Sequence, residues 1–136
     1  MDRYLFRGKR VDNGEWVQGY FMMSEPTKFT KMTHPTIVDE KTGMAEFVMP
    51  ATIGQCIGLR DENGTLIFEG DGVLLGVGSP CYGAKAVIKW DKLVCGYFAH
   101  TEYDDWYTLE ETGSFLKIIG NIHDDLELVE AQDEAQ

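Results

Sequence analysis

The 136-residue chain contains no apolar run near the roughly 18 residues that a membrane-spanning helix needs. Its first residues, Met1–Tyr4, lack the apolar stretch of a secretory signal. These absences exclude an integral membrane protein of the helical kind and give no sign of export. We therefore expect a cytoplasmic protein that makes no contact with a membrane.

Cysteine is scarce. The three cysteines, Cys56, Cys81 and Cys95, are odd in number and widely spaced, which excludes a disulfide framework. No Cys-x-x-Cys pair is present to hold zinc. We expect three reduced, buried thiols, because free cysteine usually behaves as a small apolar residue.

Signatures of catalysis are also missing. The sequence has no Gly-x-Ser-x-Gly nucleophile motif and no phosphate-binding Gly-x-x-x-x-Gly-Lys loop. His34, His100 and His123 are not spaced as metal ligands. Asp104-Asp105 and Asp124-Asp125 are adjacent pairs, whose side chains point to opposite faces of a strand. We expect no enzyme activity, no metal and no cofactor.

Positive charge is in short supply, and its distribution is uneven. The chain has 12 Lys and Arg against 23 Asp and Glu, a net charge of −11. Residues 1–50 are neutral, with seven side chains of each sign, so the whole acidic excess lies in residues 51–136. Direct binding of nucleic acid is disfavoured, because such binding depends on Lys and Arg that displace counterions from phosphates.

What the sequence does contain is one motif written twice. Residues 8–17 recur as residues 58–67, with glycine, arginine, an acid and Asn-Gly in the same positions. Asn13-Gly14 and Asn63-Gly64 each stand between apolar runs, which predicts two β-hairpins with type I′ turns and positive φ at both turn residues. Internal duplication and convergence on the same hairpin chemistry both explain the repeat.

The rest of the chain reads as short strands separated by turns. A third hairpin is expected around residues 40–43, an exposed loop at 24–35, a flexible connection at 76–83 and a last buried strand at 115–119. Only residues 124–130 fit a short helical turn, with Asp124 or Asp125 as its N-cap. Many short strands with closely spaced turns predict a mostly β protein that forms a small barrel or sandwich.

Several landmarks make the chain resemble the YopX family, which is found mainly in phages and prophages. They cover the chain in order: Arg7-Gly8-Lys9-Arg10 with Trp16, residues 52–55, Gly58-Leu59-Arg60-Asp61 with Asn63-Gly64, Gly70-Asp71 before Val73, Trp90-Asp91 and residues 119–122. The resemblance implies a mostly β fold whose C-terminal part is a barrel similar to Src-homology-3 (SH3) domains. It also implies phage or prophage origin and a bacterial cytoplasm, and it carries no established reaction.

From the resemblance and the charge pattern we expect a neutral N-terminal β lobe at 1–50, an acidic small barrel at 51–130 and a frayed tail at 131–136. Two positions depart from the family pattern. Gly72 stands where an aliphatic residue is usual, which suggests a bulge or a looser strand start. Leu126 stands where proline is frequent, so the terminal turn is expected to be more regular.

The recurring glycine, asparagine and aspartate residues have a structural explanation. Asp71 after Gly70 can cap its own turn by accepting backbone N–H groups, and Asn121 after Gly120 can do the same after the last strand. Arg10 and Arg60 are placed to reach acids across their hairpins. We therefore assign turn roles to Asn13, Gly14, Asn63, Gly64, Gly70, Asp71, Gly120 and Asn121.

The segment after His100 is the best candidate for a partner-binding surface. It combines aromatic rings, which stack on proline or cations, with carboxylates, which attract Lys and Arg. The candidate residues are Tyr103, Asp104, Asp105, Trp106 and Tyr107. The alternative is that Tyr103 and Trp106 or Tyr107 point into the core while the acids face water.

Three hypotheses on function remain. The first, which we favour, is a non-catalytic module that binds a host or phage protein. The second is self-assembly, in which the neutral lobe with Arg3, Arg7, Lys9 and Arg10 meets the acidic lobe of another copy head to tail. The third is nucleic-acid mimicry, in which carboxylates imitate phosphates and occupy a host DNA-binding protein.

Overall fold

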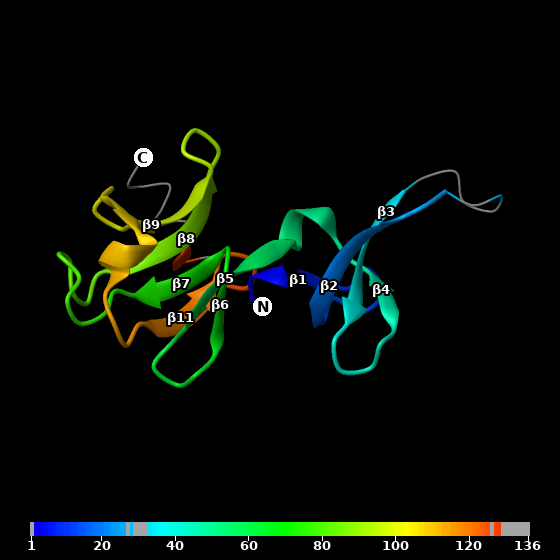
Figure 1. Ribbon diagram of the computed structural model, residues 1–136, viewed down its shortest axis with the longest axis horizontal. Coiled ribbons are helices and arrows are strands. Elements are labelled where there is room, and N and C mark those ends of the chain that lie inside the picture. The colour runs from blue at the N-terminus through cyan, green and yellow to red at the C-terminus, as the bar shows by residue number, and fades with distance from the viewer. Residues whose placement is uncertain (1, 27, 29–32, 126, 129–136) are drawn as a thin grey trace. The chain divides into compact units, whose positions relative to one another are not determined.

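The computed structural model describes residues 2–26, 28, 33–125 and 127–128, and β-strands dominate these ranges (Figure 1). The chain divides into two units, Met1–Cys56 and Ile57–Gln136, called unit 1 and unit 2 below. We expected the boundary after residue 50; the division falls within strand β5 (Gly54–Arg60).

Unit 1 is an antiparallel meander. Its strands are β1 (Leu5–Lys9), β2 (Trp16–Ser24), β3 (His34–Asp39) and β4 (Ala45–Phe47), in the sheet order β4-β3-β2-β1, and the start of β5 pairs with β1. A short 3₁₀ turn, η1 (Asp2–Tyr4), precedes β1, and another, η2 (Pro50–Thr52), precedes β5. The small core consists of Val17, Ile37 and Val48, with Phe6 and Ile53 packed against it.

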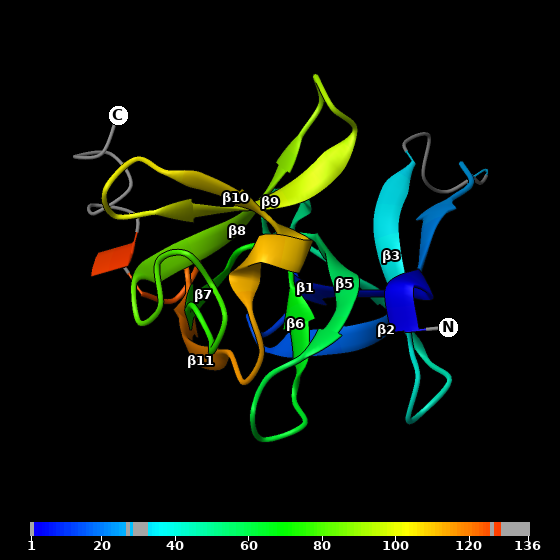
Figure 2. The ribbon, with the colours of Figure 1, turned by 60° about the vertical axis from the view of Figure 1, so that its left-hand side comes forward.

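Unit 2 contains a second antiparallel sheet. The strands of this sheet are β7 (Asp71–Leu74), β8 (Lys85–Asp91), β9 (Gly96–Thr101), β10 (Trp106–Thr108) and β11 (Lys117–Asn121). Unit 2 also contains the end of β5 and the strand β6 (Leu66–Phe68), which pairs with β5. The sheet order is β10-β9-β8-β7-β11, and Figure 2 shows β8, β9 and β10 as neighbours. A 3₁₀ turn, η3 (Leu109–Thr112), follows β10. Its N-terminus has a capping box, in which the Thr108 side chain accepts from the Glu111 N–H and the Glu111 side chain accepts from the Thr108 N–H.

The core of unit 2 lies on one face of this sheet and is larger than that of unit 1. It consists of Ile57, Ile67, Val73, Leu75, Ala84, Ala86, Ile88, Ala99 and Leu116. The protein is thus mostly β, as predicted, and it has two antiparallel sheets. The strand pairings of the described residues end at β10 and β11 and do not close the sheet into a barrel.

The duplicated motif forms two hairpins, but the predicted turn type was wrong. Gly14 and Gly64 have φ of 73° and 82°, whereas neither Asn13 nor Asn63 is among the residues with positive φ. The N–H of Asp61 bonds the Thr65 carbonyl and the N–H of Gly64 bonds the Asp61 carbonyl, at 2.8 and 3.0 Å. Each loop is longer than the two residues of a type I′ hairpin, so only the glycine needs a left-handed conformation.

The arginines of the two motifs have different partners. Arg10 bonds Asp12 of the same turn at 2.7 Å and lies 3.2 Å from Glu46 on β4. The hydrogen bond from Arg10 lowers the pKa of Asp12 below its ordinary value. Arg60 instead donates to the Gly64 carbonyl at 2.7 Å. Arg10 therefore reaches acids in the way that we predicted, and Arg60 bonds the backbone of its own turn.

The turn aspartate and asparagine both accept backbone N–H groups. Asp71 is 2% exposed and accepts from Phe68 N–H at 2.8 Å. Asn121 Oδ1 accepts from the N–H groups of His123 and Asp124 at 2.9 and 3.0 Å. Both side chains therefore accept backbone N–H groups of their own turns, as predicted.

Gly72 is not the site of a bulge. It pairs in register with Val87, and the register shift lies opposite it in β11, between Ile118 and Gly120. A Cβ on Gly72 would lie 2.5 Å from Leu128 Cδ1. The missing side chain therefore leaves room for Leu128, which is 9% exposed.

Three further expectations need correction or lie partly outside the structure. Phe115 is 72% exposed with φ of 60°, so the last strand begins at Lys117. Cys56 is buried, but Cys95 is exposed, because it lies in the tight turn between β8 and β9. Of the predicted helical turn, residues 126, 129 and 130 lie outside the described ranges, as does the tail 131–136; within it, Leu128 N–H bonds the Asp125 carbonyl at 3.1 Å.

No helix within the described ranges has the length and apolarity to cross a membrane.

Candidate functional site

The candidate segment forms the hairpin between β9 and β10. Thr101 N–H bonds the Asp105 carbonyl, and Asp104 N–H bonds the Thr101 carbonyl, at 2.8 and 3.1 Å. Thr101 Oγ1 accepts from Tyr103 and Asp105, as Asp61 accepts from Asn63 and Thr65 in the second Asn-Gly hairpin. Asp104, with φ of 64°, thus takes the place that Gly64 has there.

His100 is the buried centre of the site. Its side chain is fully covered, and Trp106 lies flat on it, with the ring centroids 4.0 Å apart and the planes 14° apart. His100 Nε2 lies 2.7 Å from Asp104 Oδ1. The imidazole therefore holds both the loop carboxylate and the indole in fixed positions.

Lys89 on β8 completes the cluster. Its Nζ lies 3.1 Å from His100 Nδ1 and 5.7 Å from the centroid of the Trp106 ring. An ammonium group only donates, so Nδ1 is the acceptor and Nε2 carries the proton that it donates to Asp104. The imidazole thus forms a hydrogen bond with each of two charged side chains, Lys89 on one side and Asp104 on the other.

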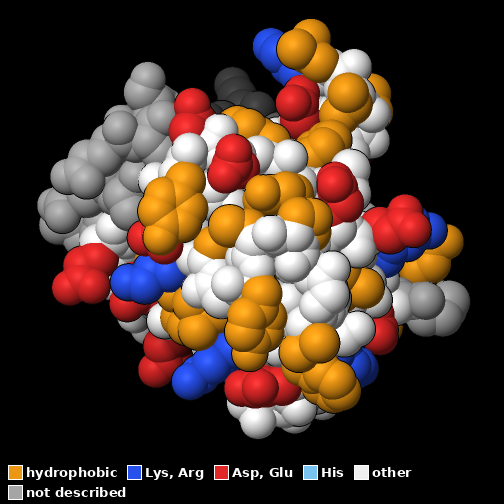
Figure 3. All heavy atoms as spheres, turned by 90° about the vertical axis from the view of Figure 1, so that its left-hand side faces the viewer, with side chains coloured by type: hydrophobic (Ala, Val, Ile, Leu, Met, Phe, Trp, Pro, Cys, Tyr) orange, Lys and Arg blue, Asp and Glu red, His pale blue; other side chains and the backbone are white. Residues whose placement is uncertain are grey.

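This cluster lies on the face of the sheet opposite the core. The pairings place Gly72, Val87, His100 and Trp106 in one row across β7, β8, β9 and β10. Trp106 is 45% exposed, and Tyr103 in the loop is 67% exposed. The exposed carboxylates of Asp104 and Asp105 lie beside the indole in the chain. Figure 3 shows one side of the molecule, on which carboxylates (red) are scattered among apolar side chains (orange).

Tyr107 takes the other direction and packs against the core of unit 2. Burial raises the pKa of its phenol, and the charge of Asp105 raises it further. The aromatic residues of the segment are therefore divided between the two alternatives. Tyr107 packs against the core, whereas Trp106 and Tyr103 are exposed at the surface.

A pocket of about 330 Å³ lies on the same face of the sheet. Val87, which precedes His100 in the row, lines it together with Leu74, Ala86, Leu128 and Glu102. Glu102 belongs to the β9–β10 loop, so the pocket and the indole are linked through one short segment. Neither the pocket nor Lys89 was predicted; the alternation of Lys89, Val87 and Lys85 on β8 was the available signal.

The remaining polar candidates are dispersed. Among the described residues, no three His, Cys, Asp or Glu side chains are grouped in a way that could hold a metal ion. Asp124 and Asp125 bond the side chain and the backbone of Asn121, respectively, at 3.1 and 2.9 Å. His34 lies beside Phe47 in unit 1, with the ring centroids 4.9 Å apart and the planes tilted by 32°.

The chain was compared with known proteins. A family model described as YopX protein matches residues 5–130. A search of curated proteins found no match. Because the family match spans most of its length, the chain belongs to the YopX family.

Proposed function

We propose that the protein is a non-catalytic accessory protein of phage or prophage origin that binds a protein partner in the bacterial cytoplasm. The partner segment is cationic, carries Lys or Arg, and lies across the outer face of β8, β9 and β10. In this proposal unit 2 is a variant of the SH3-like type, supported by its short antiparallel strands around one core.

The observation that carries the proposal is the fixed, exposed indole of Trp106. The His100 ring lies against one face of the indole, with the ring centroids 4.0 Å apart. The rest of the half-exposed Trp106 side chain is therefore available to a partner without a change of rotamer. Rigid aromatic anchors lose little conformational entropy on binding, which is why Trp is enriched at binding hot spots.

The charge of the surroundings selects the partner. Asp104 and Asp105 are exposed beside Trp106, and Glu102 lines the neighbouring pocket. The acidic excess of the whole chain lies in residues 51–136. A Lys or Arg side chain of the partner therefore meets carboxylates, while an apolar neighbour enters the pocket of about 330 Å³.

The test is capture from nuclease-treated bacterial lysate with the tagged full chain, followed by titration of the captured protein. Trp106→Ala is compared with Trp90→Ala, since Trp90 is 47% exposed and Trp106 45%. Melting temperatures confirm that each variant folds. We expect Trp106→Ala to weaken binding roughly thirtyfold, because loss of an anchoring Trp typically costs about 2 kcal/mol.

Two outcomes contradict the proposal. One is equal affinity of the wild type and Trp106→Ala for the captured protein. The other is binding that does not weaken as salt increases, since contacts between exposed charges are screened. If the partner is a DNA-binding protein and DNA displaces the chain, nucleic-acid mimicry replaces recognition of a cationic segment.

A further inference from the structure

Within the part of the chain that the structure describes, the outer part of β2 in unit 1 has an open edge. β2 runs from Trp16 to Ser24, but β1 pairs only with Trp16–Tyr20. Phe21–Ser24 pairs with β3 on one side, and no described strand pairs with it on the other. Phe21–Ser24 and its β3 partners His34–Ile37 are called the arm below (Figure 1).

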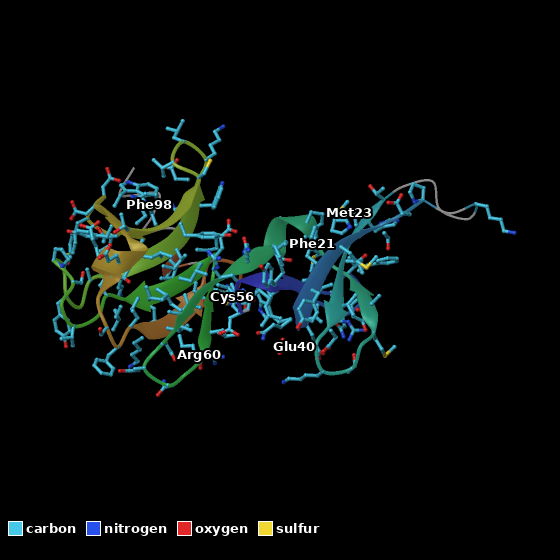
Figure 4. All side chains as sticks on the ribbon, in the orientation of Figure 1. Phe21, Met23, Glu40, Cys56, Arg60 and Phe98 are labelled. Atoms are coloured by element: carbon cyan, nitrogen blue, oxygen red, sulfur yellow. The ribbon has the colours of Figure 1, made fainter. Side chains whose placement is uncertain are left out.

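The arm carries exposed apolar side chains on both faces. Phe21, Met22 and Met23 are 37%, 45% and 44% exposed, and successive side chains of a strand point to opposite faces. Figure 4 labels Phe21 and Met23 on this strand. From Trp16 to Ser24 the chain has no charged residue and no proline. Natural edge strands usually carry such residues to prevent pairing with other chains, so an edge without them indicates a strand partner.

The backbone groups that point to the open edge follow from the ladder. Glu40 N–H donates to the Gln18 carbonyl at 3.1 Å, so the backbone groups of Gln18 point toward β3. In an antiparallel ladder this direction alternates from residue to residue. The N–H and C=O groups of Phe21 and Met23 therefore point away from β3, toward the open edge.

We propose that this edge pairs with the same edge of a second copy, antiparallel, about a two-fold axis at Met22. Phe21 then exchanges two hydrogen bonds with the partner's Met23, and Met23 does the same with the partner's Phe21. Met22 stands opposite the partner's Met22 as a non-hydrogen-bonded pair, with Cα atoms about 4.5 Å apart. The side chains that meet on each face are all apolar.

A second copy fits this edge for two reasons. The open groups lie two residues apart, at Phe21 and Met23, so the same segment in reverse presents the matching donors and acceptors. Each copy carries a net charge of −11, but residues 1–50 are neutral and the arm strand is uncharged, so the copies meet where like charges are absent. In a two-fold contact the open edges of the two copies pair with each other. No open edge then remains for a third copy, so the assembly stops at a dimer.

This contact differs from the head-to-tail assembly considered from the sequence. Arg10 of the basic cluster is bonded to Asp12 and lies near Glu46. Arg7 and Lys9 lie over the Trp16 ring, at 4.8 and 5.5 Å from its centroid. The structure thus uses much of the cluster inside unit 1, and the arm is the better surface for self-association.

Sedimentation of the full chain over a concentration series tests the proposal. The wild type is expected to form a dimer that becomes tighter as salt increases, because salt screens the repulsion between acidic copies. Met22→Lys places two charges face to face and is expected to give a monomer at every concentration. Met44→Lys is the control, because Met44 is 62% exposed and lies outside the arm. Trp106→Ala is expected to remain a dimer.

Disulfide trapping tests the register. Met22→Cys and Met23→Cys are each made with Cys81 and Cys95 replaced by Ser. Met22→Cys is expected to cross-link two chains under mild oxidation, because disulfides join Cα atoms about 4.4–6.8 Å apart. Met23→Cys, which faces the partner's Phe21, is expected not to. A wild type that is monomeric throughout, a Met22→Lys variant that dimerises like Met44→Lys, or equal cross-linking by both cysteines would overturn the proposal.

Discussion

At the scale of single residues, Asp104 occupies a position at which glycine is the easier choice. Its φ of 64° is left-handed, and Gly64 has the equivalent place in another hairpin. Aspartate tolerates this conformation better than most residues but still at a cost. The carboxylate offsets that cost by accepting the hydrogen bond from His100, whose ring is fully buried.

Two substitutions separate these effects. Asp104→Asn retains an acceptor for His100, so we expect its free energy of unfolding to stay within about 1 kcal/mol of the wild type. Asp104→Gly relieves the backbone by about 1 kcal/mol but leaves a buried donor without its acceptor, which costs about 1–3 kcal/mol. We expect Asp104→Gly to be the less stable of the two in urea unfolding. A more stable Asp104→Gly would contradict the role of the His100 bond.

Tyr107 gives a prediction for alkaline pH. Burial raises the pKa of its phenol, so the folded state holds the proton more tightly than the unfolded state, whose pKa is about 10. The free energy of unfolding should therefore fall as pH rises from about 10 toward the raised value. Tyr107→Phe removes this contribution.

The measurement is denaturant unfolding of the wild type and Tyr107→Phe at a series of pH values. The two curves should show a constant difference below pH 9 or so and then diverge, the wild type losing more stability. Parallel curves throughout the alkaline range would mean that the phenol titrates in the same way in both states.

At the scale of elements, the hairpins show what local sequence predicts and what it does not. Asn-Gly located the two repeated hairpins, because glycine at those positions permits a positive φ. It did not specify the turn type, which also depends on the bonds that Asp61 makes to the loop backbone. The loop of the β9–β10 hairpin, residues 102–105, has no glycine, so no dipeptide signal marks it.

Glycine replacement tests the revised turn geometry. A Cβ at Gly64 would meet nothing within 4 Å, so Gly64→Ala reports only the cost of a positive φ. We expect it to destabilise the protein by about 1 kcal/mol. Asn63→Ala should cost clearly less, because Asn63 is not among the residues with positive φ. Equal costs in thermal unfolding would favour the type I′ turn that the sequence suggests.

The candidate site was predictable only in part for a similar reason. The mixture of aromatic and acidic residues after His100 was visible in the sequence. The flat contact between His100 and Trp106 depends on the pairing of β9 with β10, and Lys89 reaches His100 through the pairing of β8 with β9. Such cross-strand neighbours are set by register, which short strands do not specify by themselves.

Packing between distant segments was equally hidden. Gly72 looked like a weak point of its strand, yet its missing side chain makes room for Leu128. Phe115 looked like a core residue, yet its backbone turns at φ of 60° and exposes the ring. In both cases the outcome depends on residues that are remote in sequence or on backbone conformation, and neither leaves a local pattern.

At the scale of the whole molecule, the two proposed surfaces differ in chemistry and in their response to salt. The Trp106 surface belongs to the acidic part of the chain, and the cationic segment that we propose for it should bind more weakly as salt increases. The arm belongs to the neutral part, and the dimer that we propose there is held by apolar side chains and backbone hydrogen bonds. Either surface can fail its test without affecting the other.

The measurement that tests the central claim most directly is a nuclear magnetic resonance titration of the isotope-labelled full chain with a synthetic peptide of alternating Lys, Arg and Pro residues. The account predicts shift changes at the Trp106 indole N–H and at the amides of Tyr103, Asp104 and Asp105, and their loss at high salt. Changes confined to other residues, or no change at any peptide concentration, would contradict it.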